Sequence, residues 1–170
     1  AHVAPMFAKE NYNVVSAPRT QVIADDGRHF VRTTKEKFDI ITSDPIDPWV
    51  KGCAALNTIE YYQMCKEHLK PGGVMALWIP LYENSSESAK SCIATFFKVF
   101  PNGILFSNET SDGKGYDAVL FGTLEPKKID IDAIQKFLDA HPRVNQSLTD
   151  VGYGTGGRIA DPAYADHAVA

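Results

Sequence analysis

Residues 37–49 read Lys-Phe-Asp-Ile-Ile-Thr-Ser-Asp-Pro-Ile-Asp-Pro-Trp, and this stretch is the most informative part of the sequence. Phe38 to Thr42 is a short apolar run rich in β-branched residues, which predicts a buried strand of a parallel sheet. Asp44 and Asp47 follow where that strand should end, and each precedes a proline. A residue before proline is biased toward extended geometry, and ligands of open α/β sheets bind beyond the carboxyl ends of the strands. The two carboxylates are therefore predicted on a stiff loop where such folds carry out chemistry, although Asp and Pro are also ordinary turn residues.

The segments around this stretch alternate between strand and helix patterns. Strand patterns occur at 20–24, 74–81, 104–107 and 116–122, and helical patterns occur at 28–33, 59–69, 85–100 and 131–138. Thr58 and Asp130 are the expected N-caps of two of these helices. Residues 5–11 are expected to form the end of a further helix. This alternation predicts the α/β class, with a doubly wound, mostly parallel sheet. The polar, Gly-containing linker between the last two strands predicts an antiparallel hairpin at the sheet edge. Order is expected to weaken beyond His141-Pro142.

Composition excludes several classes of protein. The chain has 170 residues, enough for one domain, and a net charge of −4 with no block of Lys or Arg, which argues against a nucleic-acid partner. Its three cysteines are widely spaced and no Cys/His cluster is present, so we expect a reducing, cytoplasmic setting and no metal. No apolar run approaches the ~18–20 residues of a membrane span, and the start lacks the features of a signal peptide.

Four stretches together resemble the later part of a spermidine synthase, an aminopropyltransferase with the Rossmann-like fold of S-adenosylmethionine-dependent methyltransferases. These are Arg19–Gly27, Phe38–Pro48, Glu60–Gln63 and Leu69–Val74. Asp47–Val50 and Trp78–Tyr82 are similar to spermidine-synthase-like domains that some bacteria carry behind membrane spans, so the soluble part of a membrane-anchored protein is a second expected setting. The resemblance covers roughly 5 to 125. It implies that 1–150 is the C-terminal portion of such a domain, without its first strands, and that 151–170 is a Gly/Ala-rich tail.

The resemblance implies a sulfonium donor, decarboxylated S-adenosylmethionine or S-adenosylmethionine, and a polyamine acceptor such as putrescine. Asp25-Asp26-Gly27 would correspond to the Gly-Asp-Gly motif of the family, and Asp26 would contact the adenine of the donor. Asp44 would act on the attacking amine, and Asp47 would shape the polyamine site. The chemistry agrees with this division, because a protonated amine cannot attack and a nearby carboxylate can accept its proton.

Two aromatic residues are further candidates for the acceptor site. Trp49 follows the Asp-Pro loop, and Tyr62 lies at the start of the next helix, where a place in the core is the alternative.

The sequence also departs from the family. Residues 1–170 contain no glycine-rich loop of the kind that cradles the donor; the only similar stretch, 152–157, lies in the tail and follows no clear strand. We therefore expect these residues alone to be inactive. A second copy of the chain, or another chain that supplies the N-terminal part, is the expected macromolecular partner. The rival readings are an S-adenosylmethionine-dependent methyltransferase and a non-catalytic domain that kept the fold.

Overall fold

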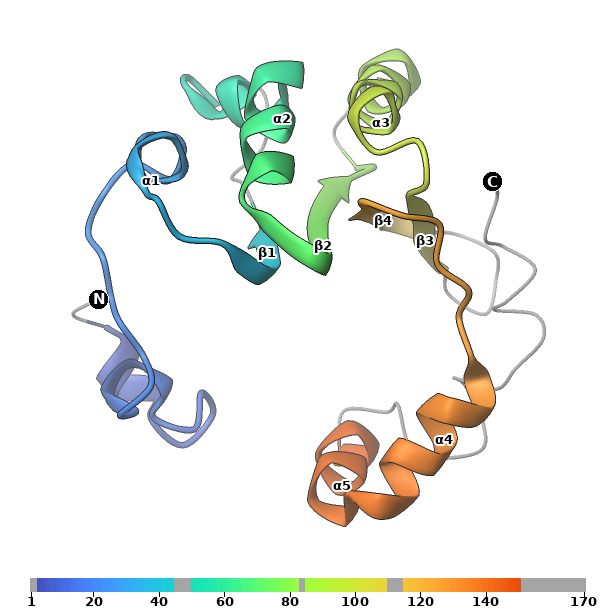
Figure 1. Cartoon of the computed structure of the whole chain (residues 1–170). Helices are drawn as coiled ribbons and strands as arrows, with labels where there is room; N and C mark the ends of the chain where they lie inside the picture. Colours follow the sequence, from blue (N-terminus) through green and yellow to red (C-terminus); the bar gives the residue numbers. More distant parts are fainter. Residues whose placement is uncertain (1–2, 45–49, 83–84, 110–114, 151–170) are drawn as a thin grey trace. The chain divides into compact units, whose positions relative to one another are not determined.

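The structure is a computed structural model, and it describes residues 3–44, 50–82, 85–109 and 115–150. The chain divides into two compact units, Ala1–Thr34 and Lys35–Ala170, and each is considered by itself (Figure 1). None of the helices within the described ranges is long and apolar enough to cross a membrane.

The first unit contains the helix α1 (Gly27–Thr33), preceded by short 3₁₀ helices at Ala4–Phe7 and Val14–Ser16. The prediction of a strand at 20–24 is wrong, because these residues adopt no regular secondary structure and Val22 and Ile23 are exposed. A strand is stable only when a neighbour satisfies its backbone groups. Among the described residues, none pairs with 20–24. The local preference of this segment for extended backbone is therefore not enough to form a strand.

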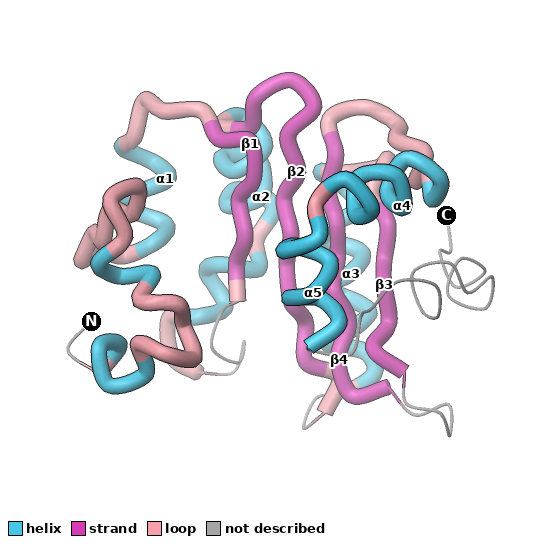
Figure 2. The backbone as a smooth tube through the Cα atoms, turned by 90° about the horizontal axis from the view of Figure 1, so that it is seen from below, coloured by secondary structure: helices cyan, strands magenta, loops and turns pink. Residues whose placement is uncertain are grey.

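The second unit is built on a four-stranded sheet of described residues. Its strands are β1 (Phe38–Ser43), β2 (Leu69–Pro80), β3 (Ile104–Glu109) and β4 (Gly115–Thr123), in the order β1-β2-β4-β3. β1 and β2 are parallel, whereas β4 is antiparallel to both β2 and β3. The predicted parallel pairing of the second and third strand patterns and the predicted C-terminal hairpin are therefore confirmed. Figure 2 shows the strands side by side in this order, with α2 and α3 behind them.

The helices α2 (Ile59–Glu67) and α3 (Ser86–Val99) cover one face of this sheet. Both begin at a capping side chain: the Thr58 hydroxyl accepts a hydrogen bond from the Tyr61 amide, and the Ser85 hydroxyl accepts one from Ser88. Such caps are stabilising because they satisfy amides that have no partner within the helix. The local signals that predicted these helices are thus the ones that start them.

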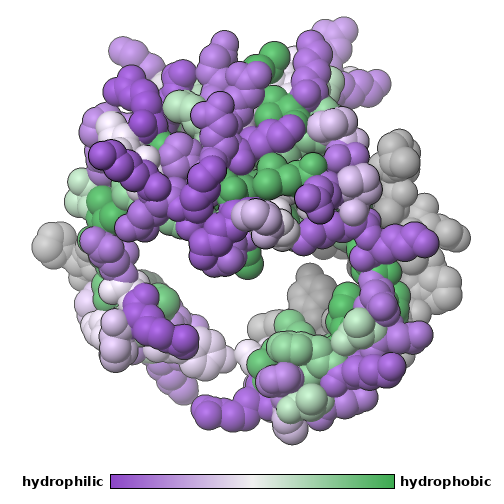
Figure 3. All heavy atoms as spheres, viewed as in Figure 1, coloured by the Kyte–Doolittle hydropathy of each residue, from purple (hydrophilic) through white to green (hydrophobic). Residues whose placement is uncertain are grey.

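The core lies between the helices and the sheet. The largest completely buried side chains of the described residues are Tyr62, Phe96, Phe100, Met75, Leu77, Ile79, Leu120, Pro80 and Cys65. On this face Gly122 of β4 lies directly under the Phe100 ring, where a Cβ atom would come within 2.5 Å of a ring carbon. Figure 3 shows the surface of this part of the protein, with polar side chains over the two helices and apolar side chains gathered beneath them.

β1 is less buried than its apolar sequence predicted. Ile40 is 68% exposed, and no residue of the strand is fully buried. The reason is position: β1 is at the edge of the sheet, and β2 is its only partner among the strands that the structure describes. An apolar run therefore correctly indicated a parallel strand here and wrongly indicated that both its faces would be covered.

Two further helices follow the sheet, α4 (Ile131–Ala140) and α5 (Pro142–Asp150). α4 was predicted, and the Asp130 carboxylate caps it by accepting from the Ala133 amide. The expectation of weak order after His141 is wrong for 142–150. Proline fits the first position of a helix, where its missing N–H is no loss, so Pro142 starts α5 rather than ending regular structure.

Candidate active site at the carboxyl end of the sheet

Asp44 leaves the sheet at the edge where the sequence placed it. It follows directly after Ser43, the last residue of β1, and its side chain is exposed. Ser43 pairs with Leu77 of the parallel strand β2, so the carboxyl ends of both strands lie at the same edge. Ligands of open α/β sheets bind at this edge. An exposed carboxylate is thus available there to a molecule from solvent.

Two of the predicted site residues belong to the stretch that follows Asp44 in the sequence. Asp47 and Trp49, and the prolines at 45 and 48, lie outside the described residues. Their assignment to the acceptor site stays a prediction.

Tyr62 is completely buried on α2. Its ring makes an edge-to-face contact with Phe96, with centroids 5.3 Å apart, and its hydroxyl donates a hydrogen bond of 3.1 Å to Asn57 Oδ1. Burial raises the pKa of the phenol well above its usual range, so the hydroxyl stays protonated. These surroundings support the core role that the sequence left open, rather than contact with a ligand.

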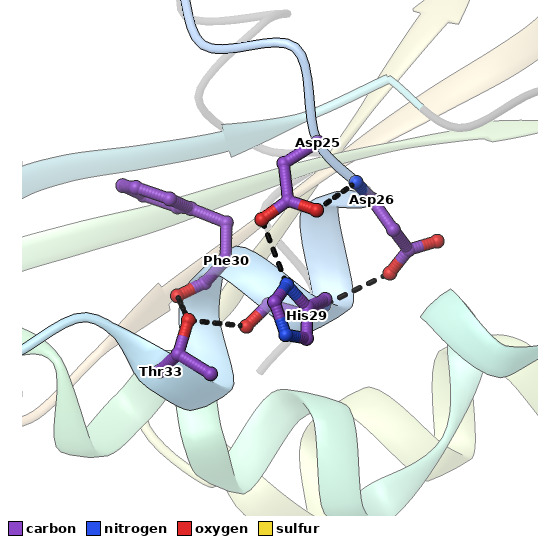
Figure 4. A network of polar contacts seen from close by, with 5 residues as sticks. All are labelled: Asp25, Asp26, His29, Phe30 and Thr33. Carbon is purple, nitrogen blue, oxygen red and sulfur yellow. Dashed lines mark hydrogen bonds and ion pairs between the residues drawn. The ribbon is translucent and has the colours of Figure 1, made fainter.

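Asp25, Asp26 and Gly27 form the start of α1 in the first unit (Figure 4). The Asp26 side chain caps the helix by accepting a hydrogen bond of 2.8 Å from the His29 amide. Asp25 accepts two bonds of 2.8 Å, one from the Asp26 amide and one at the Nδ1 atom of His29. Both aspartates therefore have a local structural role, as turn and cap residues do.

The His29 ring also affects the charge of this loop. Its hydrogen bond to Asp25 lowers the pKa of that carboxyl below its ordinary value, against a smaller opposing effect of desolvation. Asp25 therefore remains ionised to lower pH than an isolated aspartate. The contact of Asp26 with a donor adenine stays a prediction.

The structure adds two residues that sequence reasoning missed. The Trp78 indole of β2 donates a hydrogen bond of 3.1 Å from Nε1 to the Asp117 carboxylate of β4, near the carboxyl end of β2. The signal in the sequence was a charged residue at the start of the apolar run 118–121, inside a predicted strand. Among the described residues no group of three His, Cys, Asp or Glu side chains could hold a metal ion.

The parallel β1–β2 pair, the helices on one face of the sheet and Asp44 after β1 are features of an α/β protein of the Rossmann-like kind, in which ligands bind at the carboxyl edge. Comparison with known proteins then gives the family. The sequence profile of the spermine/spermidine synthase domain matches residues 2–106, more than half of the chain. The chain belongs to this family, as its motifs indicated.

Individual relatives agree with this assignment. A polyamine aminopropyltransferase of Buchnera aphidicola (Schizaphis graminum) is 42% identical over 69 residues, which are 40% of this chain and 23% of the relative. Polyamine aminopropyltransferase 1 of Pseudomonas aeruginosa is 43% identical over 58 residues, which are 34% of this chain and 20% of the relative. The aligned part of the chain therefore spans about a fifth of these relatives.

Solved structures match a larger part of the chain. A spermidine synthase in complex with the transition-state analogue AdoDATO has a TM-score of 0.67 at 26% identity, over 80% of this chain and 48% of that one. The spermidine synthase of Thermotoga maritima has a TM-score of 0.62 at 25% sequence identity, and the match covers 80% of this chain and 47% of that one. Human methyltransferase-like protein 13 has a TM-score of 0.58 at 21% sequence identity, over 84% of this chain and 67% of that one. This likeness shows a shared fold.

Proposed function

We propose that the full-length protein transfers an aminopropyl group from decarboxylated S-adenosylmethionine to a polyamine such as putrescine. The observation that carries this proposal is the place of Asp44, an exposed carboxylate at the carboxyl end of β1 in a chain that belongs to the spermine/spermidine synthase family. A spermidine synthase whose structure matches 80% of this chain was solved in complex with the transition-state analogue AdoDATO.

In the proposed reaction, the amine nitrogen attacks the carbon next to the sulfonium sulfur. The new C–N bond forms as the C–S bond breaks, and the electron pair of that bond goes to sulfur, which leaves as a neutral thioether. Asp44 orients the amine and accepts the proton that the nitrogen loses, because only a neutral amine has the lone pair needed for attack. Asp47 holds the acceptor through its negative charge.

Asp26 is the proposed contact for the adenine of the donor. Its Oδ1 is engaged by the His29 amide, and this bond fixes the orientation of the carboxylate at the start of α1. Residues 1–170 lack a glycine-rich loop after a strand. The proposal therefore concerns the full-length protein.

The experiment is a donor and acceptor assay of purified full-length protein with product identification by mass spectrometry. Decarboxylated S-adenosylmethionine and putrescine should yield spermidine and methylthioadenosine. Transfer of a methyl group from S-adenosylmethionine instead would identify a methyltransferase. Turnover with neither donor, in a protein shown to be folded, would support a domain that kept the fold without catalysis.

A further inference from the structure

The second face of the sheet, away from α2 and α3, carries an unusual carboxylate. In β4 the residues Ala118, Leu120 and Gly122 face the helices, as the contact of Gly122 with Phe100 shows. Side chains alternate along a strand, so Asp117 points to the opposite face. Trp78 lies on that face too, since its neighbours Leu77 and Ile79 are buried in the core.

Asp117 is buried but only partly satisfied. It is 8% exposed. Its Oδ2 atom accepts the hydrogen bond from Trp78 Nε1, while its Oδ1 atom is buried without a hydrogen-bond partner among the described residues. Carboxylates are seldom this buried unless they are paired, because removal of a charge from water is costly. A buried carboxylate oxygen with no donor calls for an explanation, and an ammonium group that donates to it is one that fits its negative charge.

The register of the sheet places this carboxylate beside the proposed active site. Asp117 pairs with Pro80 at the carboxyl end of β2. On the other side of β2, Ser43 pairs with Leu77, so the next residue, Asp44, is level with Trp78. Strands are spaced by about 4.8 Å, so β1 and β4 are roughly 10 Å apart across β2. Asp44 and Asp117 thus flank Trp78 at one edge of the sheet.

Trp78 suits the space between the two carboxylates. Its indole N–H fixes the orientation of Asp117, and the Tyr82 ring lies nearby, with centroids 6.2 Å apart. Aromatic faces attract ammonium groups and also bury methylene chains. A molecule with an alkyl chain and an ammonium group at each end matches this order of carboxylate, aromatic ring and carboxylate.

We propose that Asp117, oriented by Trp78, binds the distal ammonium group of the diamine acceptor while the other nitrogen reacts at Asp44. This inference rests on the proposed function and names a further residue of the same site. It assigns Asp117 to binding of the acceptor, with no part in the transfer of the proton. Trp78 has two parts in this arrangement: its indole N–H orients the Asp117 carboxylate, and its ring lies between the two carboxylates where the alkyl chain would pack.

The test compares diamine and monoamine acceptors in the full-length protein. Asp117→Asn keeps the size of the side chain and should raise KM for putrescine at least tenfold, with kcat within about threefold of the parent. With butylamine, which has no second ammonium group, the same variant should leave KM unchanged. Trp78→Phe should act on KM for putrescine in the same direction. Thermal unfolding shows that each variant is folded.

Asp39→Asn is the matched control. This residue is 79% exposed and forms an ion pair of 2.8 Å with Lys70 at the opposite end of the sheet, so its loss should leave KM for both amines unchanged. If folded Asp117→Asn retains the parent KM for putrescine, or raises KM equally for both amines, Asp117 is a structural partner of Trp78 and the inference is wrong.

The outcome can be separated from that of the proposed function. If the protein turns over no donor, calorimetric titration with putrescine decides. Binding that Asp117→Asn weakens at least tenfold, and Asp39→Asn does not, supports the ammonium site without aminopropyl transfer. No binding of putrescine to the parent protein, or equal binding by Asp117→Asn, overturns it.

Discussion

Replacement of Tyr62 by Phe separates a core residue from one that binds substrate. The change removes one hydroxyl and keeps the ring that packs on Phe96. That hydroxyl donates to Asn57 Oδ1, and Asn57 Nδ2 already has no partner among the described residues. The variant therefore leaves this half-buried amide without a described partner. A hydrogen bond lost in this way costs about 1–2 kcal/mol.

The assay is urea unfolding of parent and variant, together with KM for the amine in the full-length protein. Tyr62→Phe should lower the free energy of unfolding by about 1–2 kcal/mol, and Tyr62→Ala by about 3–5 kcal/mol, because it also leaves a cavity. Neither kcat nor KM should change in Tyr62→Phe. Tyr12→Phe is the control, since the same atom is lost from a residue that is 80% exposed. A tenfold rise in KM for Tyr62→Phe at unchanged stability would refute the core assignment.

Four other predictions concern Cys65, Asp26 and the sulfonium donor. Burial raises the pKa of the Cys65 thiol to about 11. This cysteine should therefore resist thiol reagents at pH 8 in the native protein and react only on unfolding. Equal rates of modification of Cys65 and the half-buried Cys53 in the native protein would contradict this. The same shift should reduce stability as pH rises from about 9 to 11, since the unfolded thiol ionises first, and Cys65→Ala should flatten that decline in urea unfolding. Asp26→Ala should cost about 1 kcal/mol in urea unfolding through loss of the α1 cap, whereas Asp26→Asn, an equally good cap, should cost little; an equal loss in both variants would show that the cap is not the cause. Residues 1–170 alone should show no micromolar binding of either sulfonium donor by calorimetry, because they lack the glycine-rich loop; micromolar affinity would place the donor site elsewhere.

Elements with local signals could be predicted from the sequence. Thr58 and Asp130 precede apolar helical periodicity, and both cap helices that begin at the next residue. The polar linker after 104–107 likewise predicted the β3–β4 hairpin, whose strands are neighbours in sequence and in space. In each case the residues that determine the element lie within it or beside it.

Features that depend on distant partners could not be predicted. The extended preference of 20–24 produced no strand, because pairing requires a neighbour that local sequence does not specify. The apolar pattern of β1 predicted burial, but exposure of Ile40 follows from the place of β1 at the sheet edge.

The candidate site shows the same division. The position of Asp44 after β1 could be predicted because this residue directly follows its strand, whereas its role in catalysis stays a prediction. The core place of Tyr62 depends on Phe96, 34 residues away in the sequence. The pair of Trp78 and Asp117 joins residues 39 positions apart through the register of an antiparallel pairing, so neither residue alone predicted it.

The proposed role of Asp44 in catalysis can be measured by steady-state kinetics of Asp44→Asn in the full-length protein, with decarboxylated S-adenosylmethionine and putrescine. The variant should stay folded and bind the donor as the parent does, because Asp44 is exposed and follows the last residue of β1. Its kcat should fall by about 10²–10⁴-fold, the usual contribution of a positioned acid–base group. A kcat within a few-fold of the parent would show that the loop after β1 is only a turn, and would contradict the account.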